Sequence, residues 1–281
     1  MAANSHNRSL NIEICEAIQQ MVYDCDYHLF VRLKEKIMTT GTSEAAKQGY
    51  NPVIDLMLIH ASNANYAIYE AVYGSCEGGH FELFKSLFSL IKPSLGKQQL
   101  TSDDLKDGKW NKAINKLVKD SSNQNHMFYC AGVGGNRLIV DMLLKEFKIL
   151  EICNEEHIDN VFVGACYGGH LELALWAVEE GATNYFDGFC EACENNQFNI
   201  VETLVNLLEE SPLRSMIYEV SIKGYIDIIQ CFKKNELIED WNWVLEGACT
   251  GLKQNIIELA IDNGANSCNH CSKPIKDHLS K

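Results

Sequence analysis

The sequence has little positive charge. It holds 24 lysine and arginine residues against 38 aspartate and glutamate residues, which gives a formal net charge of −14 at pH 7. Nucleic-acid-binding proteins neutralise phosphates with clustered lysine and arginine side chains, so this balance argues against a nucleic-acid partner. An acidic chain is compatible with a basic partner, although acidity is usually a solubility feature.

Long apolar runs are also absent. A membrane-spanning helix needs about 20 consecutive apolar residues, and no stretch of this sequence approaches that length. The chain opens without a charged and then apolar signal segment. We therefore expect a cytoplasmic protein that does not bind membranes.

The sequence lacks the motifs of common catalytic sites. It contains no nucleophile elbow, P-loop, dinucleotide fingerprint or H-E-x-x-H motif. Two glycine pairs, Gly134-Gly135 and Gly168-Gly169, stand between helical segments and lack the strand that precedes a phosphate-binding loop. The sequence therefore predicts a protein that is not an enzyme and carries no cofactor.

The clearest structural signal is the stretch Gly164–Asn184, GACYGGHLELALWAVEEGATN. Gly168-Gly169 are expected to break one helix, because glycine costs backbone entropy in a helix and takes positive φ readily. A second helix over 170–180 has apolar residues at three- and four-residue spacing, and Gly181 follows as its C-cap. Such a pair buries too little apolar area to fold alone, so it must stack on another copy.

Weaker copies of this unit recur along the chain. We align them on an anchor position, and the spacings between anchors from Ala46 onward are 30, 56, 34, 27, 28 and 28 residues. The later anchors are Cys76, Gly132, Cys166, Cys193, Ser221 and Cys249. Four residues before them stand large apolar residues: Val72, Phe128, Phe162, Phe189, Ile217 and Leu245. One large and one small column per unit is what stacked helices need to interdigitate.

The repeat pattern also explains several of the twelve cysteines. A disulfide framework is typical of small secreted domains, whereas several of these cysteines fall in the small anchor column. We expect the anchors Cys76, Cys166, Cys193 and Cys249 to be small core residues in a reducing compartment. The Cys190-x-x-Cys193 pair is expected to pack in the same core.

The repeat resembles the ankyrin repeat. Residues 165–182 match its core pattern A-A-x-x-G-H-L-E-I-V-x-L-L-x-x-G-A, and 75–84 and 248–265 match it in part. The T-P-L-H opening is missing, and the period of 27–28 residues is shorter than the usual ~33. The resemblance implies an all-α fold, an ankyrin-type helix-turn-helix solenoid with shortened inter-repeat fingers.

The form G-A-C-x-G-G-H-L-E-L…G-A-x-N and the ending GANSCNHCSKPIKDHL are similar to ankyrin proteins of giant DNA viruses of amoebae. That resemblance implies a host protein as the partner and the host cytoplasm as the location. Stacked repeats create a long concave surface lined by inter-repeat fingers and first helices, so we expect a monomeric, non-catalytic interaction scaffold that binds a partner protein through this concave face. The expected contact residues stand beside the anchors: Tyr73, Tyr129, Val163, Tyr167, Tyr218 and Glu246.

Three regions are distinguished along the chain. Residues 1–42 are expected to form N-terminal capping helices, with a docking module as the alternative. Residues 43–266 form the repeat array, interrupted at about 93–125 by a degenerate repeat or an insertion; the spacing of 56, twice 28, favours the degenerate repeat. Residues 267–281 form a polar tail.

The turn residues are Gly78, Gly79 and His80 in one unit and Gly168, Gly169 and His170 in another. A histidine at this place could be a metal ligand or a base. The ankyrin resemblance implies a structural role instead, in which the histidine hydrogen bonds to backbone groups of the turn.

The polar tail holds the best candidate for chemistry. Cys268, His270 and Cys271 form a C-x-H-C cluster, and His278 follows seven residues later. Two thiolates and imidazoles could hold Zn²⁺, which gives an alternative function as a metal-binding or catalytic module. The pattern is only half a site, because a strong zinc prediction needs two ligand pairs, and the other interpretation is a tail with incidental thiols.

Overall fold

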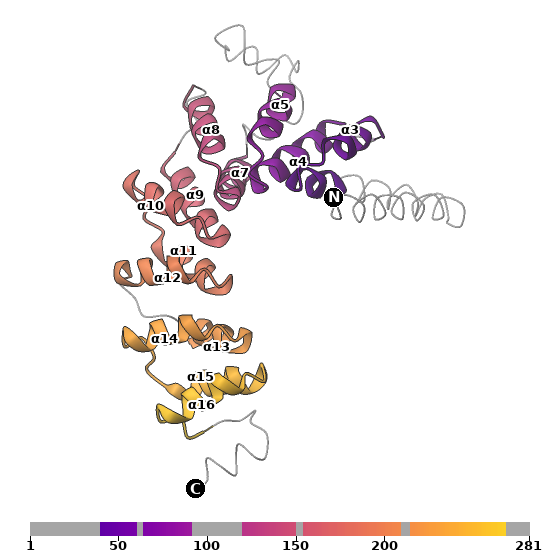
Figure 1. Cartoon of the computed structure of the whole chain (residues 1–281). Helices are drawn as coiled ribbons and strands as arrows, with labels where there is room; N and C mark the ends of the chain where they lie inside the picture. Colours follow the sequence, from indigo (N-terminus) through magenta and orange to yellow (C-terminus); the bar gives the residue numbers. More distant parts are fainter. Residues whose placement is uncertain (1–39, 61–63, 92–119, 150–153, 209–213, 268–281) are drawn as a thin grey trace, which may run out of the picture.

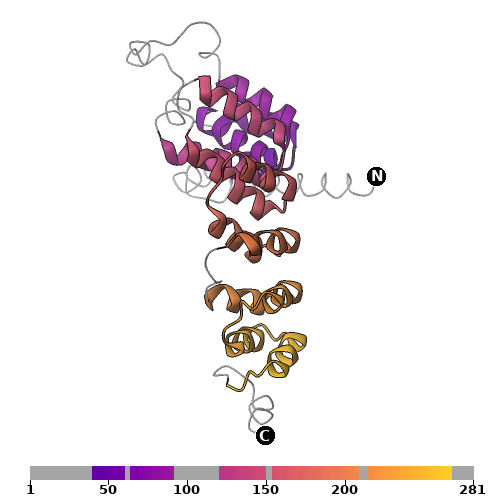
Figure 2. The same cartoon turned by 90° about the vertical axis from the view of Figure 1, so that its left-hand side faces the viewer.

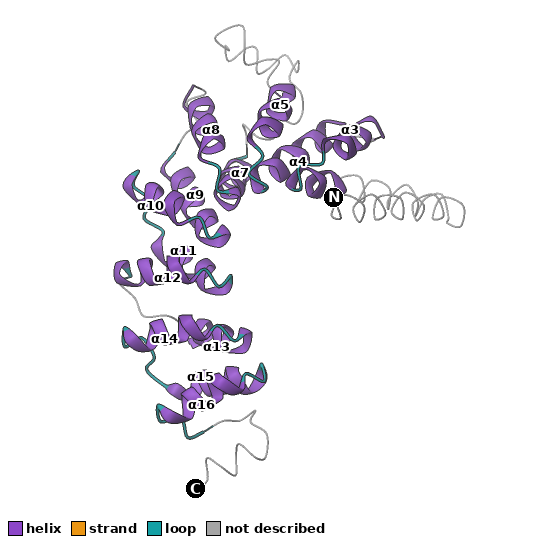
Figure 3. Cartoon of the chain, viewed as in Figure 1, coloured by secondary structure: helices purple, strands orange, loops and turns teal. Residues whose placement is uncertain are grey.

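The computed structural model describes residues 40–60, 64–91, 120–149, 154–208 and 214–267. Every regular element in these ranges is a helix, and no strand occurs in them (Figure 3). The expected all-α class is therefore confirmed for the described part of the chain. None of its helices is both long and apolar enough to cross a membrane.

The helices come in pairs, each made of a first helix, a tight turn and a second helix. Residues 40–47 are helical and pair with α3 (Asn51–His60). The remaining pairs are α4 (Ala64–Glu77) with α5 (Phe81–Ile91), α7 (Ser121–Gly134) with α8 (Arg137–Ile149), α9 (Glu155–Gly168) with α10 (Leu171–Glu179), α11 (Tyr185–Glu194) with α12 (Phe198–Leu204), α13 (Arg214–Lys223) with α14 (Ile226–Lys234), and α15 (Trp241–Thr250) with α16 (Gln254–Asp262). A short 3₁₀ helix, η1 (Val205–Leu207), continues α12.

The first helices form a continuous row. Each contacts the first helix of the next pair, in the order α4, α7, α9, α11, α13 and α15. Figures 1 and 2 show the pairs following one another along the length of the molecule. A pair therefore buries its apolar side against its neighbours, as the repeated columns of the sequence predicted.

The turn within each pair depends on one residue in the left-handed region. In the best-matched unit this residue is Gly169, with φ 81°, and Gly168 before it is still the last residue of α9. The expected break at both glycines is therefore one residue too early. The equivalent left-handed residues of the other pairs are Gly49, Gly79, Gly135, Asn196, Gly224 and Leu252.

The first glycine of the pair has a different role, which is close helix approach. A Cβ atom placed on Gly168 would overlap the carbonyl oxygen of Val133 on α7, and one on Gly164 would overlap the carbonyl oxygen of Tyr129. Gly247 on α15 shows the same crowding, with the Tyr218 carbonyl oxygen 2.5 Å from its ideal Cβ position. Small residues four apart therefore let neighbouring first helices approach backbone to backbone.

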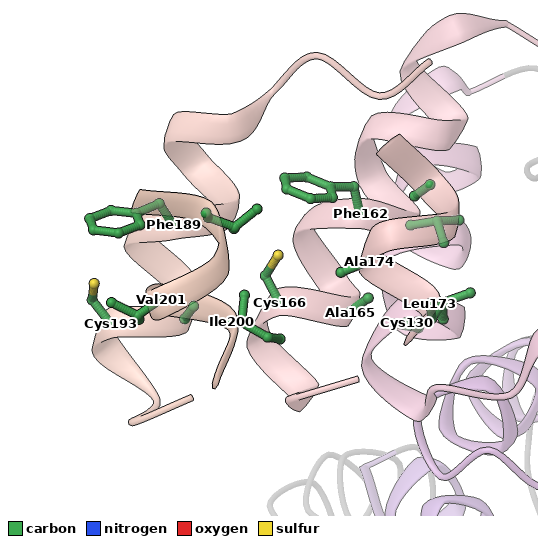
Figure 4. Packing of buried hydrophobic residues seen from close by; sticks show 14 of the residues in the cluster. Cys130, Phe162, Ala165, Cys166, Leu173, Ala174, Phe189, Cys193, Ile200 and Val201 are labelled. Carbon is green, nitrogen blue, oxygen red and sulfur yellow. The ribbon is translucent and has the colours of Figure 1, made fainter. Parts of the chain in front are cut away.

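The core consists of the two columns that the sequence predicted. Phe162 and Phe189 from the large column, and Cys166 and Cys193 from the anchor column, are all 0% exposed. Figure 4 shows this arrangement repeated in neighbouring units. The cysteines of the described residues are free thiols, and burial raises the pKa of Cys166 to about 12. These thiols stay protonated and pack as small apolar groups.

The connections that end the pairs are short and tied back to the first helix. The Asp159 carboxylate on α9 accepts hydrogen bonds from the backbone N–H of Thr183 at 2.6 Å and of Asn184 at 3.1 Å. Asn242 occupies the same position on α15, and its Oδ1 accepts from the N–H groups of Asn266 and Ser267, both at 2.9 Å. Both side chains stand seven residues before their anchors, so the recurrence extends to the loops.

The interruption of the array has a clear topological consequence. α4 packs directly on α7, and α5 contacts α8, so the two units on either side of the interruption are neighbours. The Nδ2 group of Asn136 donates to the carbonyl oxygen of Gly79 at 2.9 Å across this junction. Among the described helices, no further pair stands between α4 and α7 in the row. Residues 92–119, to which most of the proposed degenerate repeat belongs, lie outside the described residues.

The two ends of the chain cannot be compared with expectation in the same way. Of the capping region 1–42, only residues 40–42 are described, and of the polar tail 267–281, only residue 267 is described.

Candidate interaction face

Two positions per unit of the first helices lie repeatedly outside the packing, and single units add other exposed or half-buried residues, such as Glu191 on α11. The two repeated positions stand three residues before and one residue after the anchor, and almost all of them are half-buried or exposed. We call them the first-helix face: Glu77, Tyr129, Val133, Val163, Tyr167, Cys190, Glu194, Tyr218, Ile222, Glu246 and Thr250. Five of these residues were expected from the sequence: Tyr129, Val163, Tyr167, Tyr218 and Glu246.

Tyr73 was expected on this face, and that prediction was wrong. Its side chain is 6% exposed, and its hydroxyl donates to the carbonyl oxygen of Asn123 on α7 at 2.8 Å. The hydroxyl also meets that of Tyr69 one turn earlier, and burial raises the pKa of Tyr73. Because α4 and α7 close over this position, Tyr73 joins two units and is not free to bind a partner.

Tyr129 and Tyr167 form a pair of aromatic rings on the face. Their ring centroids lie 6.2 Å apart with the planes tilted by 59°, and Tyr167 is 39% exposed. His126, an exposed residue one turn before Tyr129, stacks on it with centroids 6.4 Å apart. Val163 is half-buried on α9. His126 is not among the contact residues expected from the sequence, although its position one turn before Tyr129 could have indicated it.

Tyr218 and Glu246 are used to hold α13 against α15. The Tyr218 hydroxyl lies 3.2 Å from the Oγ1 atom of Thr250. Arg214 donates through Nη2 to Oε2 of Glu246 at 2.9 Å, and the Glu246 side chain is only 13% exposed. These two residues were expected to contact a partner. In the structure, both make contacts that join neighbouring units.

The face is electrostatically negative around Tyr129. Burial is the main cause that raises the pKa of Tyr129, and the charge of Glu191 on α11 adds to it. Burial also raises the pKa of Glu191, with Glu194 and Asp187 adding to the effect and Lys223 opposing it. Glu191 is half-buried, and it has no hydrogen bond or ion pair to its carboxylate within the described residues. It is a functional candidate that the sequence did not single out.

The turn histidines bind backbone groups of the preceding unit. Nε2 of His80 lies 3.0 Å from the carbonyl oxygen of Lys47, and Nε2 of His170 lies 2.8 Å from that of Val133. A carbonyl oxygen only accepts, so Nε2 carries the proton in both rings. Gln197 continues the series, because its Nε2 group donates to the Tyr167 carbonyl oxygen at 3.1 Å. These side chains therefore link each unit to the one before it. Their N–H groups donate to backbone carbonyl oxygens, which is a structural role.

His157 is a buried imidazole at the start of α9. Its Nδ1 atom accepts from the backbone N–H of Asn154 at 3.3 Å, and Asn154 Oδ1 accepts from the His157 N–H at 3.2 Å, which completes a capping box. The ring stacks on Phe128 at 4.3 Å between centroids. Its Nε2 atom is buried and has no hydrogen-bond partner among the described residues, and burial lowers the pKa of His157 to about 4.

The candidate metal ligands lie partly inside and partly outside the described residues. Within the described residues no group of three or more histidine, cysteine, aspartate or glutamate side chains is arranged to hold a metal ion. Cys190 is half-buried and Cys193 buried on α11, and burial raises the pKa of both thiols. The proposed zinc ligands Cys268, His270, Cys271 and His278 lie outside the described residues.

Comparison of the chain with models of known protein families and with curated protein sequences finds no match in either case.

Proposed function

We propose that the chain is a non-catalytic scaffold of the ankyrin type, which binds a partner protein through its first-helix face. The repeated architecture supports the ankyrin part of the proposal. Each pair carries the helix, the left-handed turn residue and the second helix at the places that the ankyrin pattern implies. The described connections after α10 and α14 are short and contain no strand, which agrees with shortened fingers.

The observation that carries the binding proposal is the row of side chains left outside the packing on consecutive first helices. Tyr129 and Tyr167 present two aromatic rings from neighbouring units. Tyrosine is enriched in protein interfaces because it brings a large area with a polar tip at low entropy cost. A face of this kind, repeated along a stack, suits an extended partner. The resemblance to ankyrin proteins of giant DNA viruses extends the proposal to a host protein in the host cytoplasm.

Capture from host-cell lysate tests this proposal when it is combined with matched variants. Tyr167→Ala removes an aromatic ring from the face, and Leu175→Ala removes an apolar side chain of equal exposure, 39%, from the second helix α10. We expect Tyr167→Ala to reduce recovery of a specific protein and Leu175→Ala to leave it unchanged, as measured by quantitative mass spectrometry.

A deletion of 268–281 separates the scaffold from the alternative that acts through the tail. The scaffold proposal predicts that capture survives the deletion. Capture that needs the tail but ignores Tyr167 would contradict the proposal and favour a module built on Cys268 and Cys271.

A further inference from the structure

We infer that the part of the first-helix face from α7 to α11, together with the adjoining Glu191, binds a cationic segment of the partner, rich in arginine or lysine. The inference rests on the proposed function, since it specifies the chemistry of the partner at the same face. Three features carry it: an excess of carboxylates, one half-buried carboxylate that accepts no hydrogen bond and forms no ion pair within the described residues, and two aromatic rings on the two preceding first helices.

The charge balance of the described first helices is strongly negative. Two of their three cations are ion-paired, Lys47 with Glu77 and Arg214 with Glu246. The third, Lys223, donates from Nζ to the carbonyl oxygen of Glu194 at 2.8 Å and forms no ion pair within the described residues. Carboxylates without an ion pair remain at Glu70, Asp187, Glu191, Glu194 and Glu219. The side of the row that faces away from the second helices therefore attracts positive charge.

Glu191 is the carboxylate at which we expect a bound cation to form the most favourable interaction. Its carboxylate is half-buried, and Asp187 and Glu194 on the same helix add repulsion. A half-buried carboxylate loses hydration without receiving a donor, so an arriving guanidinium or ammonium group forms a charge-assisted hydrogen bond where none existed. Lys223 is the cation that opposes this repulsion, and it donates its bond to a backbone carbonyl.

The aromatic rings complete the recognition. Tyr129 on α7 and Tyr167 on α9 lie 6.2 Å apart between ring centroids, and α9 contacts both α7 and α11, the helix that carries Glu191. A basic segment that crosses these helices can place one cation at Glu191 and another over a tyrosine ring, with its aliphatic stem covering the apolar ring surface. α7, α9 and α11 follow one another in the row (Figure 1), so a chain crossing them meets these groups in turn.

Charge complementarity selects this occupant over the others. Nucleic acids and anionic membranes carry negative charge and are repelled by the face. A second copy of this chain has a net charge of −14 and would bring like charge against the same carboxylates. A basic segment of another protein is the occupant that the face attracts.

Fluorescence anisotropy tests the inference directly. The ligand is a labelled peptide that alternates arginine and serine, and the comparisons are peptides with glutamine or glutamate in place of each arginine. We expect only the arginine peptide to bind. Glu191→Gln should weaken binding about tenfold through loss of a charge-assisted hydrogen bond, and Tyr167→Ala about threefold through loss of a cation–π contact.

Glu172→Gln is the matched control, because it removes one carboxylate from an exposed position on the second helix α10. We expect it to change the affinity less than about twofold. Failure of the arginine peptide to bind, equal binding of all three peptides, or equal weakening by Glu172→Gln and Glu191→Gln would each overturn the inference. A dimer in light scattering that Tyr167→Ala dissociates would also overturn it, since a second copy would then occupy the face.

The two proposals fail separately. If lysate capture depends on Tyr167 while the arginine peptide does not bind, the scaffold function stands and the cationic partner is withdrawn. If the peptide binds as expected but capture ignores Tyr167, the cation-binding face stands and the scaffold function is withdrawn.

Discussion

Acid should destabilise the array through His157, because this imidazole is buried between two phenylalanine rings at the junction of three helices. Its ring stacks on Phe128 of α7 at 4.3 Å and meets Phe147 of α8 edge-on at 5.5 Å, both between centroids. Nδ1 is occupied as an acceptor in the capping box of α9. Protonation would turn that acceptor into a donor and place a charge among apolar rings. Glu156, the charge that favours the protonated form, offsets only part of this cost.

The magnitude follows from proton linkage. The pKa of His157 falls from 6.5 in the unfolded chain to about 4 in the folded chain. The unfolded state therefore takes up the proton first as the pH falls. Stability is complete above pH 6.5, declines below it and levels off once the pH is below about 4. Between pH 7 and pH 5 the loss is about 2 kcal/mol.

Urea unfolding at a series of pH values measures this effect. His157→Gln is the control variant, because glutamine keeps an acceptor at the third position of the helix for the capping box but does not titrate. The difference in unfolding free energy between wild type and variant should shrink or change sign as the pH falls from 7 to 5. A difference that stays constant over this range would refute the reasoning, since carboxylates common to both proteins cancel.

Three further predictions concern the packing of the units and the conformation of their turns. Gly164→Ala should destabilise the junction of α7 and α9 by roughly 1–3 kcal/mol in urea unfolding, because its methyl group meets the Tyr129 carbonyl oxygen; stabilisation from higher helix propensity would contradict this. Leu252→Gly should raise stability by about 1 kcal/mol, since Leu252 has φ 55° and is 86% exposed; an unchanged or lower melting temperature would count against it. Phe162→Ala should cost roughly 3–5 kcal/mol and speed hydrogen exchange in α9 and its neighbours more than in α15; a uniform rise along the chain would show that the units do not unfold locally.

Much of the architecture could be predicted because the sequence repeats its own packing pattern. The large and small columns placed Phe162, Phe189, Cys166 and Cys193 in the core before any coordinates, and all four are buried. A periodic pattern predicts which side of a helix is covered by its neighbours. It does not report how closely two backbones approach. For that reason the glycine pair predicts a turn at Gly168, although this residue lies within α9.

The interaction face was less predictable, because exposure there depends on the neighbouring unit. Tyr73 and Tyr129 occupy the same column, yet α7 covers Tyr73 with the Asn123 carbonyl oxygen and leaves Tyr129 half-buried. Tyr218 finds a hydroxyl on the next helix. Such cross-unit contacts join residues about 30 to 50 positions apart, and no local pattern reveals them. Glu191 became a candidate only when its surroundings were known.

The side chains that link each turn to the preceding unit show a second limit. His170 could be linked to the turn through its family resemblance, whereas Gln197 and Asn136 perform the same task with different chemistry. Each binds a backbone carbonyl of the preceding unit. The shared feature is position, directly after the left-handed residue, and only coordinates identify that residue when it is not glycine, as at Asn196.

Site-specific photo-crosslinking tests the central claim most directly. A photoreactive phenylalanine analogue replaces Tyr167 on the first-helix face or, in a matched protein, Leu175 on α10; both positions are 39% exposed. In host-cell lysate, the account predicts that the analogue at position 167 crosslinks to a distinct partner protein and that the analogue at 175 does not. Crosslinking from 175 without crosslinking from 167 would contradict it, because the partner would then bind the opposite side of the row.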